Sequence, residues 1–264
     1  MRASAAAAPP SFVSFDTPSA HVVCDYRFAS AARAVLERGS LYAYARSEPA
    51  ARALAGRGIA YAVSLPGDST GVVVRHNRHG GMLAAVTGDV FRWPSRAPLE
   101  LAISHTLRAA GVSTPEIVCY ALYRAAPGFC RADVVTLEVP DSRDLSAAIT
   151  SPDADHRASA LRAAARLVSR LTTAGARHHD LNVKNVLLHD RPHGTGDGGS
   201  DLDALVLDVD RVVFSSDRRA VREANLARLL RSARKWRDRY GAPITEAELT
   251  ELAALVRGPE LAST

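Results

Sequence analysis

The most constraining feature of the chain is a polar loop that is followed by two short apolar runs. The segment 178–188 places Asp180 and Asn185 five residues apart, just before the first apolar run. The second apolar run, Leu205–Leu207, leads directly into the acidic pair that begins at Asp208. Short apolar runs separated by a polar, glycine-rich segment are typical of a strand hairpin. The pattern therefore predicts a loop that leads into one strand, next to a strand with an acidic end.

These residue types match the requirements of phosphoryl transfer. One carboxylate must orient the acceptor hydroxyl, an amide oxygen must hold Mg²⁺, and a second carboxylate must link Mg²⁺ to the phosphates. We expect Asp180 to be the orienting carboxylate, with Asn185 and Asp208 as the metal ligands. The alternative is an ordinary polar turn capped by Asp and Asn side chains.

The loop resembles the H-R-D-x-x-x-x-N and D-F-G segments of the protein-kinase-like fold. It is more similar to the lipopolysaccharide core kinase family, above all its 3-deoxy-D-manno-octulosonic acid (Kdo) kinases, on the residues His178-x-Asp180-Leu181-Asn182-x-x-Asn185 and Asp208-Val209-Asp210-Arg211. Further matching segments are Gly56-Arg57-Gly58, Arg75–Gly81, Ala132–Thr136, Asp144-Leu145 and Asn225–Leu229.

The resemblance implies an α+β, two-lobed protein-kinase-like fold. We expect a flexible tail over residues 1–20, a nucleotide-binding lobe over 21–138 with an antiparallel sheet and one main helix, and a mostly helical catalytic lobe over 139–264. The family also implies ATP and Mg²⁺ as cofactors, with Gly56 and Gly58 forming a bend over the nucleotide. One G-x-G without a third glycine is a weak signal of such a bend.

Local patterns predict several elements of this fold. Apolar and β-branched runs on either side of a Pro66-Gly67-Asp68 turn predict a hairpin over residues 61–75. Leucine and isoleucine at four-residue spacing predict a helix over Pro98–Ala110 that ends before Gly111. Further helices are predicted around residues 161–171, which Gly175 ends, over 221–236, and after Thr245, which forms a capping box with Glu248. Apolar runs predict two more strands, near 117–122 and 134–139.

Lysine is almost absent, and this excludes one large class of kinases. Of the 33 Lys and Arg residues only Lys184 and Lys235 are lysines, and neither is followed by Ser or Thr, so the chain has no P-loop. The strand lysine of protein kinases is missing too. We expect Arg75 to hold the phosphates in its place, because its planar fork suits bidentate contact, and to pair with Glu100 in the following helix. The alternative is a surface arginine on a strand.

The net charge of +5 favours anionic partners, although an arginine-biased genome would give the same excess. The resemblance implies a Kdo-bearing lipid A precursor as acceptor and peripheral contact with the anionic cytoplasmic face of the bacterial inner membrane. The basic helix around 218–237 is a candidate contact surface, and a solvated helix face is the alternative. Nucleic acid is not expected, because few aromatic residues interleave with the arginines. Three widely spaced cysteines without a CxxC pair favour a reducing cytoplasm.

Two weaker motifs are interpreted as structural. Gly194–Gly199 matches G-x-G-x-x-G, but the strand follows the motif where a dinucleotide fold needs a strand before it, so we expect a solvated loop. The adjacent His178 and His179 lack a further ligand at zinc spacing. The leading hypothesis is thus an ATP-dependent kinase of Kdo. The alternatives are a protein-kinase-like phosphotransferase with another small-molecule or protein acceptor, and a binding module that kept the fold.

Overall fold

The computed structural model describes residues 9–55, 58–78, 88–190 and 202–258. The chain divides into two compact units. Unit 1 comprises Met1–His105 and Pro115–Glu138, and unit 2 comprises Thr106–Thr114 and Val139–Thr264.

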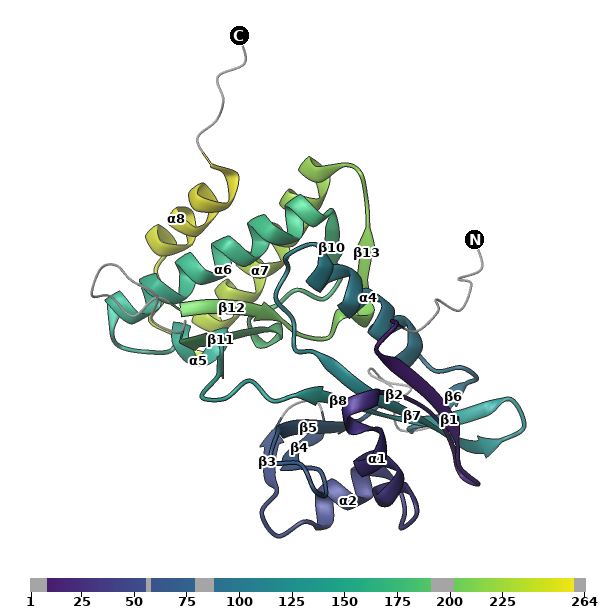
Figure 1. Ribbon diagram of the computed structural model, residues 1–264. Helices are drawn as coiled ribbons and strands as arrows, with labels where there is room; N and C mark the ends of the chain where they lie inside the picture. The colour runs from purple at the N-terminus through teal and green to yellow at the C-terminus, as the bar shows by residue number, and fades with distance from the viewer. Residues whose placement is uncertain (1–8, 56–57, 79–87, 191–201, 259–264) are drawn as a thin grey trace. The chain divides into compact units, whose positions relative to one another are not determined.

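Unit 1 is built on an antiparallel sheet. Its order is β1-β2-β7-β8-β5-β4-β3, with β6 paired to β8 beyond the end of β5 (Figure 1). The strands are β1 (Phe12–Asp16), β2 (Ala20–Asp25), β3 (Arg52–Ala55), β4 (Ile59–Ser64), β5 (Gly71–His76), β6 (Phe91–Arg92), β7 (Ile117–Ala126) and β8 (Phe129–Leu137). The predicted hairpin is confirmed as β4 and β5, joined through Gly67, whose φ of +76° suits glycine.

The prediction of a flexible tail over residues 1–20 is wrong for the part of that segment that forms β1. β1 pairs with β2 from Phe12↔Asp25 to Asp16↔His21. Thr17 closes the turn, because its Oγ1 accepts a hydrogen bond from the Ala20 N–H. The turn residues Thr17-Pro18-Ser19 between two runs with bulky apolar residues were the sequence signal for this hairpin.

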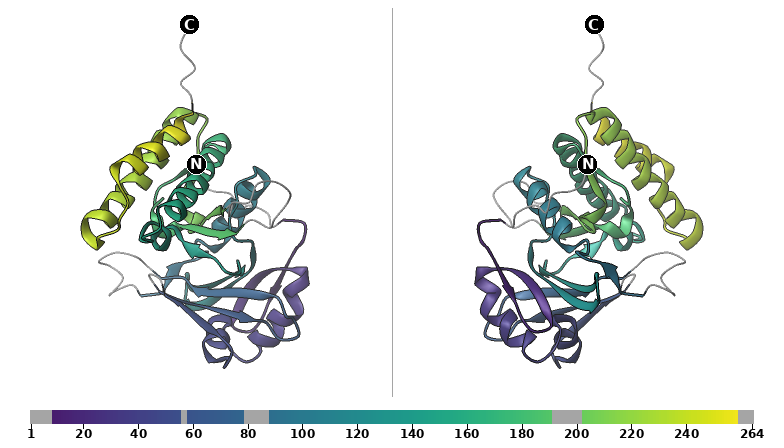
Figure 2. Two further views of the ribbon diagram at one scale, coloured as in Figure 1. Left: turned by 90° about the vertical axis from the view of Figure 1, so that its left-hand side faces the viewer. Right: turned by 90° about the vertical axis from the view of Figure 1, so that its right-hand side faces the viewer.

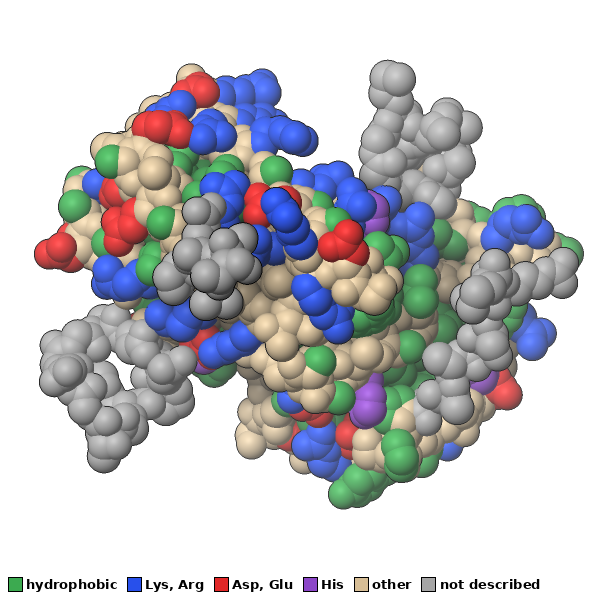
Figure 3. All heavy atoms as spheres, turned by 90° about the horizontal axis from the view of Figure 1, so that it is seen from above, with side chains coloured by type: hydrophobic (Ala, Val, Ile, Leu, Met, Phe, Trp, Pro, Cys, Tyr) green, Lys and Arg blue, Asp and Glu red, His purple; other side chains and the backbone are tan. Residues whose placement is uncertain are grey.

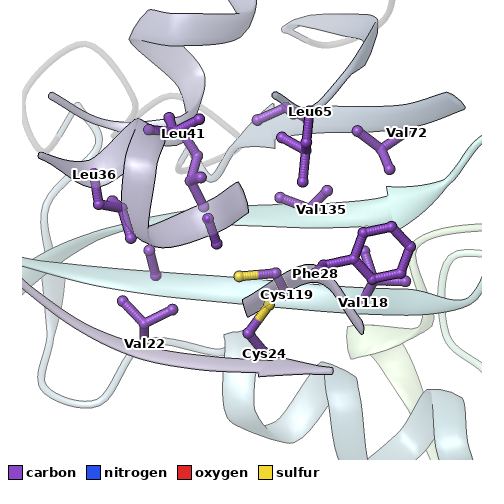
Figure 4. Close-up of a cluster of buried hydrophobic side chains, with 14 of the residues drawn as sticks. Val22, Cys24, Phe28, Leu36, Leu41, Leu65, Val72, Val118, Cys119 and Val135 are labelled. Atoms are coloured by element: carbon purple, nitrogen blue, oxygen red, sulfur yellow. The ribbon is translucent and has the colours of Figure 1, made fainter. Parts of the chain in front are cut away.

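The sheet of unit 1 is covered on both faces. The 3-10 turn η1 (Tyr26–Phe28) leads into α1 (Ala29–Leu36), and α2 (Leu41–Ser47) follows; neither helix was predicted. Phe28, Leu36 and Leu41 pack with the sheet residues drawn in Figure 4. On the other face lies α4 (Ala97–Ala109), the predicted main helix, whose Ala97 and Leu101 pack on Val134 and neighbouring side chains.

Unit 2 is mostly helical, as predicted. Its long helix α6 (Ala154–Ala174) packs against α5 (Leu145–Ile149), α7 (Arg218–Tyr240) and α8 (Glu246–Arg257). The last two run side by side in the yellow-green part of Figure 2. Gly175 ends α6 at φ +68°, and Thr245 and Glu248 form the predicted capping box of α8. The remaining elements are β9 (Arg143–Asp144), β10 (Ala176–His178), η2 (Val183–Asn185), β11 (Val186–Asp190), β12 (Leu202–Val206), η3 (Val209–Arg211) and β13 (Val212–Phe214).

Together these elements confirm the α+β fold class. Within the described residues, no helix has both the length and the apolar character needed to cross a membrane.

Candidate active site

The polar loop of unit 2 begins at a buried strand end that one asparagine holds in place. His178 is the last residue of β10 and is fully buried. The amide of Asn225, on α7, accepts a hydrogen bond from the His178 N–H at 2.9 Å and donates one to the Ala176 carbonyl at 2.9 Å. Asn225 is itself fully buried. Helix α7 therefore fixes the backbone from which the loop departs, which gives the Asn225–Leu229 motif a structural reason.

The imidazole of His178 connects the predicted catalytic loop at Asp180 to the segment that leads into Asp208. Its Nδ1 accepts a hydrogen bond from the Asp180 N–H at 3.1 Å, so the ring proton resides on Nε2 and is donated to the Leu207 carbonyl at 2.9 Å. Burial lowers the pKa of His178, which favours this neutral tautomer. One side chain thereby ties the backbone at Asp180 to the backbone immediately before Asp208.

Asn185 closes the loop from the other side. Its Nδ2 donates to the Asp180 carbonyl at 2.9 Å, and its own carbonyl accepts from the Leu207 N–H at 2.9 Å. The side chain is buried, and its amide nitrogen is committed to the loop, so Oδ1 is the atom left to face a cation. Asn182 also supports the loop, since its Nδ2 donates to the Asp180 carbonyl and its Oδ1 accepts from the Lys184 N–H.

Asp208 lies at the same end of the β11–β12 hairpin as Asn185. Its backbone is left-handed, with φ +53° and ψ +48°, a conformation that non-glycine residues seldom adopt. The residue is exposed, and its carboxylate makes no hydrogen bond or ion pair with a described residue. Strained backbone that presents an uncommitted carboxylate is a frequent property of functional positions.

Unit 1 contains the predicted cation. Arg75, on β5, forms an ion pair with Glu100 in the first turn of α4, as expected. The Glu100 side chain is only 6% exposed, while that of Arg75 is 30% exposed. A buried carboxylate needs a partner, so Glu100 holds the guanidinium in place while part of Arg75 stays accessible. Nη1 of Arg75 also donates to Oδ1 of Asn77 at 3.3 Å.

The glycine bend is described only in part. Gly56, together with Arg57, lies outside the described residues, as do His79, Gly80 and Gly81 of the basic motif and the Gly194–Gly199 segment. Gly58 is described and lies directly before β4. A Cβ at Gly58 would meet only Cδ of Arg78, at 3.8 Å.

The oxygen donors of the loop fit magnesium bound jointly with phosphates. Among the described residues, no group of three or more His, Cys, Asp or Glu side chains could hold a metal ion by itself. Magnesium usually takes one or two carboxylates, waters and substrate phosphates rather than a cage made only of protein. The amide oxygen of Asn185 and the carboxylate of Asp208 suit that mode of binding.

The comparison with known protein families decides the class of the protein. Residues 45–255 match the lipopolysaccharide kinase (Kdo/WaaP) family. The chain belongs to this family. The match covers the β5 strand, the polar loop and α7, and it confirms the resemblance on which the kinase assignment depends.

Curated relatives of this lipopolysaccharide kinase agree with the assignment. The chain is 33% identical over 193 residues to the 3-deoxy-D-manno-octulosonic acid kinase of Xanthomonas campestris pv. campestris strain B100, covering 69% of this chain and 68% of the relative. It is 30% identical over 191 residues to that of Stenotrophomonas maltophilia strain K279a, with 69% and 68% covered. It is 25% identical over 207 residues to that of Vibrio parahaemolyticus, with 73% and 79% covered.

Solved structures show the same fold at low identity. WaaP in complex with acyl carrier protein superposes with a TM-score of 0.54 at 19% identity, covering 90% of this chain and 89% of that one. The amicoumacin kinase hAmiN, in complex with AMP-PNP, Ca²⁺ and Ami, gives 0.54 at 11% identity, covering 85% and 79%. The lipopolysaccharide kinase thus has the protein-kinase-like fold that was predicted.

Proposed function

We propose that this lipopolysaccharide kinase transfers the γ-phosphate of ATP to a hydroxyl of Kdo on a lipid A precursor. Its curated relatives are Kdo kinases. The observation that supports the chemistry most directly is the pair of hydrogen bonds made by the His178 imidazole. They join the backbone of Asp180 to the backbone of Leu207, directly before Asp208. The Kdo kinase activity of those relatives supports the choice of acceptor.

In this proposal each polar side chain of the loop has one role. Asp180 accepts a hydrogen bond from the Kdo hydroxyl and orients its oxygen for in-line attack on the γ-phosphorus. Oδ1 of Asn185 and the carboxylate of Asp208 would hold Mg²⁺. When bound, Mg²⁺ neutralises charge on the phosphate oxygens. His178 does not touch substrate and acts as a positioning residue.

The nucleotide is held by unit 1. Arg75 supplies the cation that contacts the α- and β-phosphates, and Glu100 keeps its fork aimed. Gly56 and Gly58 are assigned to the bend over the nucleotide, because residues without a side chain let the backbone approach the phosphates closely. An arginine in this role donates two parallel hydrogen bonds where a lysine would present a point charge.

The acceptor is an anionic glycolipid, so the proposal includes peripheral contact with the cytoplasmic face of the inner membrane. The cations of α7 are only partly available for it. Arg234 and Arg237 both bind Glu246, and Glu223 binds Arg222 and Arg257. These ion pairs make Arg222, Arg234 and Arg237 less available for direct contact with lipid.

Label transfer from γ-labelled ATP tests the assignment. The wild-type chain is expected to label a Kdo-bearing lipid A precursor but not the Kdo-free precursor. Asp180→Ala should lower kcat by about 10³-fold or more while changing ATP binding little, because the carboxylate orients the acceptor and not the nucleotide. Asp155→Asn, an exposed acidic change on α6, is the matched control and should retain activity.

Two outcomes would contradict the proposal. Near-normal activity of Asp180→Ala would remove that residue from the catalytic role. Equal labelling of both precursors would show that Kdo is not the acceptor. In that case a protein-kinase-like phosphotransferase with another small-molecule or protein acceptor becomes the function to test.

A further inference from the structure

The tip of the β7–β8 hairpin exposes apolar side chains together with arginines. The end of β7 and the turn, residues 125–128, are all exposed, and so is Phe129, which is 43% exposed. Trp93, on the segment after β6, is 42% exposed. The tip forms the right-hand end of the sheet in Figure 1, and that end of Figure 3 shows basic and apolar side chains together. Clustered exposed aromatic residues mark interaction surfaces, whereas isolated ones do not.

The register of the strands places the two aromatic residues at one tip. The Trp93 N–H donates to the carbonyl of Gly128 at 2.9 Å, and Arg92 lies opposite Phe129. The β6 segment is therefore attached to the hairpin turn. Both rings belong to the last residues of the sheet at this end.

The rings flank the tip on opposite faces of the sheet. Ala132 and Val134 of β8 pack in the cluster that contains α4, so by strand alternation Phe129 points to the other face. Trp93 approaches His21 of β2, with ring centroids 6.3 Å apart. His21 precedes Val22, which packs with α1 and α2, so His21 and Trp93 lie on the α4 face. One aromatic ring therefore lies on each face of the sheet near the end of the hairpin. This end of the hairpin, with Phe129 on one face and Trp93 on the other, is called the wedge below.

The charge of this wedge is positive. Arg92 and Arg124 are exposed, and neither side chain forms an ion pair with a described residue. The acidic groups nearby are already paired. Asp16 binds His21, and Asp89 binds Arg131 and His76.

We propose that the tip of the β7–β8 hairpin inserts into the headgroup region of an anionic lipid bilayer. Tryptophan rings partition to the boundary between headgroups and acyl chains, and arginines bind anionic headgroups beside them. A wedge with aromatic side chains on both faces suits tip-first insertion, while a protein partner would be met by one face. The inference deepens the membrane contact in the proposed function by naming the element that makes it, and its test does not depend on phosphoryl transfer.

Fluorescence of the full chain with Trp236→Phe makes Trp93 the only tryptophan and tests insertion directly. With vesicles of phosphatidylglycerol and phosphatidylcholine, the Trp93 emission should shift to the blue and be quenched by brominated acyl chains. In vesicle co-sedimentation, the double variant Trp93→Ala/Phe129→Ala should lose about tenfold or more of the partition coefficient. Arg92→Gln/Arg124→Gln should lose a similar factor on anionic vesicles and little on phosphatidylcholine alone.

Two matched variants serve as controls. Tyr26→Ala/Leu255→Ala removes exposed apolar side chains elsewhere, and Arg219→Gln/Arg228→Gln removes two charges from α7. Both should sediment with vesicles as the parent does, and thermal unfolding should show that every variant is folded.

Three results would each overturn the inference. They are vesicle binding by either tip variant at the level of the parent, a Trp93 emission spectrum that vesicles do not change, and an equal loss of vesicle binding in the control variants. Phosphoryl transfer to a detergent-solubilised, Kdo-bearing acceptor is measured on the same preparations. If the chain binds vesicles but transfers no phosphate, the proposed function is contradicted and the membrane inference stands. If the chain transfers phosphate but does not bind vesicles, the membrane inference is contradicted and the proposed function stands.

Discussion

Glu100 is a buried carboxylate whose ion pair with Arg75 is expected to control nucleotide binding. Glu100→Gln leaves the shape of the site intact but removes the charge that aims the guanidinium. We expect the KM for ATP to rise by about tenfold with little change in kcat, because the phosphate contact is lost in the ground state and the transition state alike. Steady-state kinetics with varied ATP measure both constants.

A surface ion pair in the same unit provides the control for this change. Glu116 pairs with Arg27, which is half exposed, so Glu116→Gln should leave both constants unchanged. If Glu100→Gln gave wild-type kinetics, Arg75 would not hold the phosphates through this pair.

His76 makes the stability of unit 1 depend on pH. Its Nδ1 lies 2.6 Å from Asp133, which is fully buried, and its Nε2 lies 2.9 Å from Asp89, which also binds Arg131. The hydrogen bond to Asp133, opposed by burial and aided by Asp89, raises the pKa of His76 above 6.5. The charged imidazole therefore stabilises the fold fully below about pH 6.5, and the gain is lost as the pH rises through the folded-state pKa.

Urea unfolding of the wild type and of His76→Asn between about pH 5.5 and pH 9 measures this contribution. The difference in unfolding free energy should be largest at the acidic end and should shrink as the pH rises. Titrating groups that do not contact His76 cancel in the difference. A difference that stays constant across this range would show that His76 is neutral in the folded protein.

At the scale of elements, two glycines with the same backbone conformation end two long helices. Gly175 after α6 has φ +68°, and Gly241 after α7 has φ +67°. A Cβ at Gly241 would meet open space, so Gly241→Ala should cost only the left-handed strain, about 1 kcal/mol. A Cβ at Gly175 would collide with the carbonyl of Ser215 and the guanidinium of Arg218. Gly175→Ala should therefore cost about 3 kcal/mol or more in urea unfolding, and equal costs would show that the chain relaxes around Gly175.

The charge of helix α7 looks different in the sequence and in the folded chain. As a sequence it is a run of arginines that suggests one continuous cationic surface. In the structure Arg234 and Arg237 lower the pKa of Glu246 to about 2 through hydrogen bonds from α7 to α8. Part of the charge therefore holds α7 and α8 together and is not free for a partner.

For the whole molecule, the net charge of +5 should make catalysis on a lipid-linked acceptor sensitive to salt. Raising ionic strength from about 0.05 M to 0.5 M shortens the Debye length from roughly 14 Å to 4 Å and screens attraction to anionic vesicles. Initial rates with a vesicle-bound acceptor should fall several-fold, while rates with a water-soluble Kdo acceptor should change little. An equal loss with both acceptors would place the salt effect in the nucleotide or acceptor site.

Local sequence patterns were sufficient to predict the helices and strands that have a clear apolar periodicity or are bounded by typical turn residues. They predicted β4, β5, β7, β8, β11, β12, α4, α6, α7 and α8. They also singled out the residues that the proposal uses, Asp180, Asn185, Asp208, Arg75 and Glu100. They missed α1, because Ala29–Leu36 has only eight residues and no capping side chain marks its start after Phe28. They also missed β1, whose partner strand had to be known before residues 12–16 could be assigned to the sheet.

Only the tertiary structure decided how those residues are held. The imidazole of His178 joins Asp180 to Leu207, 27 residues away, and Asn225 on α7 fixes the strand from which His178 extends. Such pairings depend on packing between segments far apart in the chain, which no local pattern records. The sequence alone determined the class of fold and which side chains are available for phosphoryl transfer. The folded chain determined the protonation of His178, the orientation of the loop side chains and which arginines remain free, because each depends on burial and on the nearest charged group.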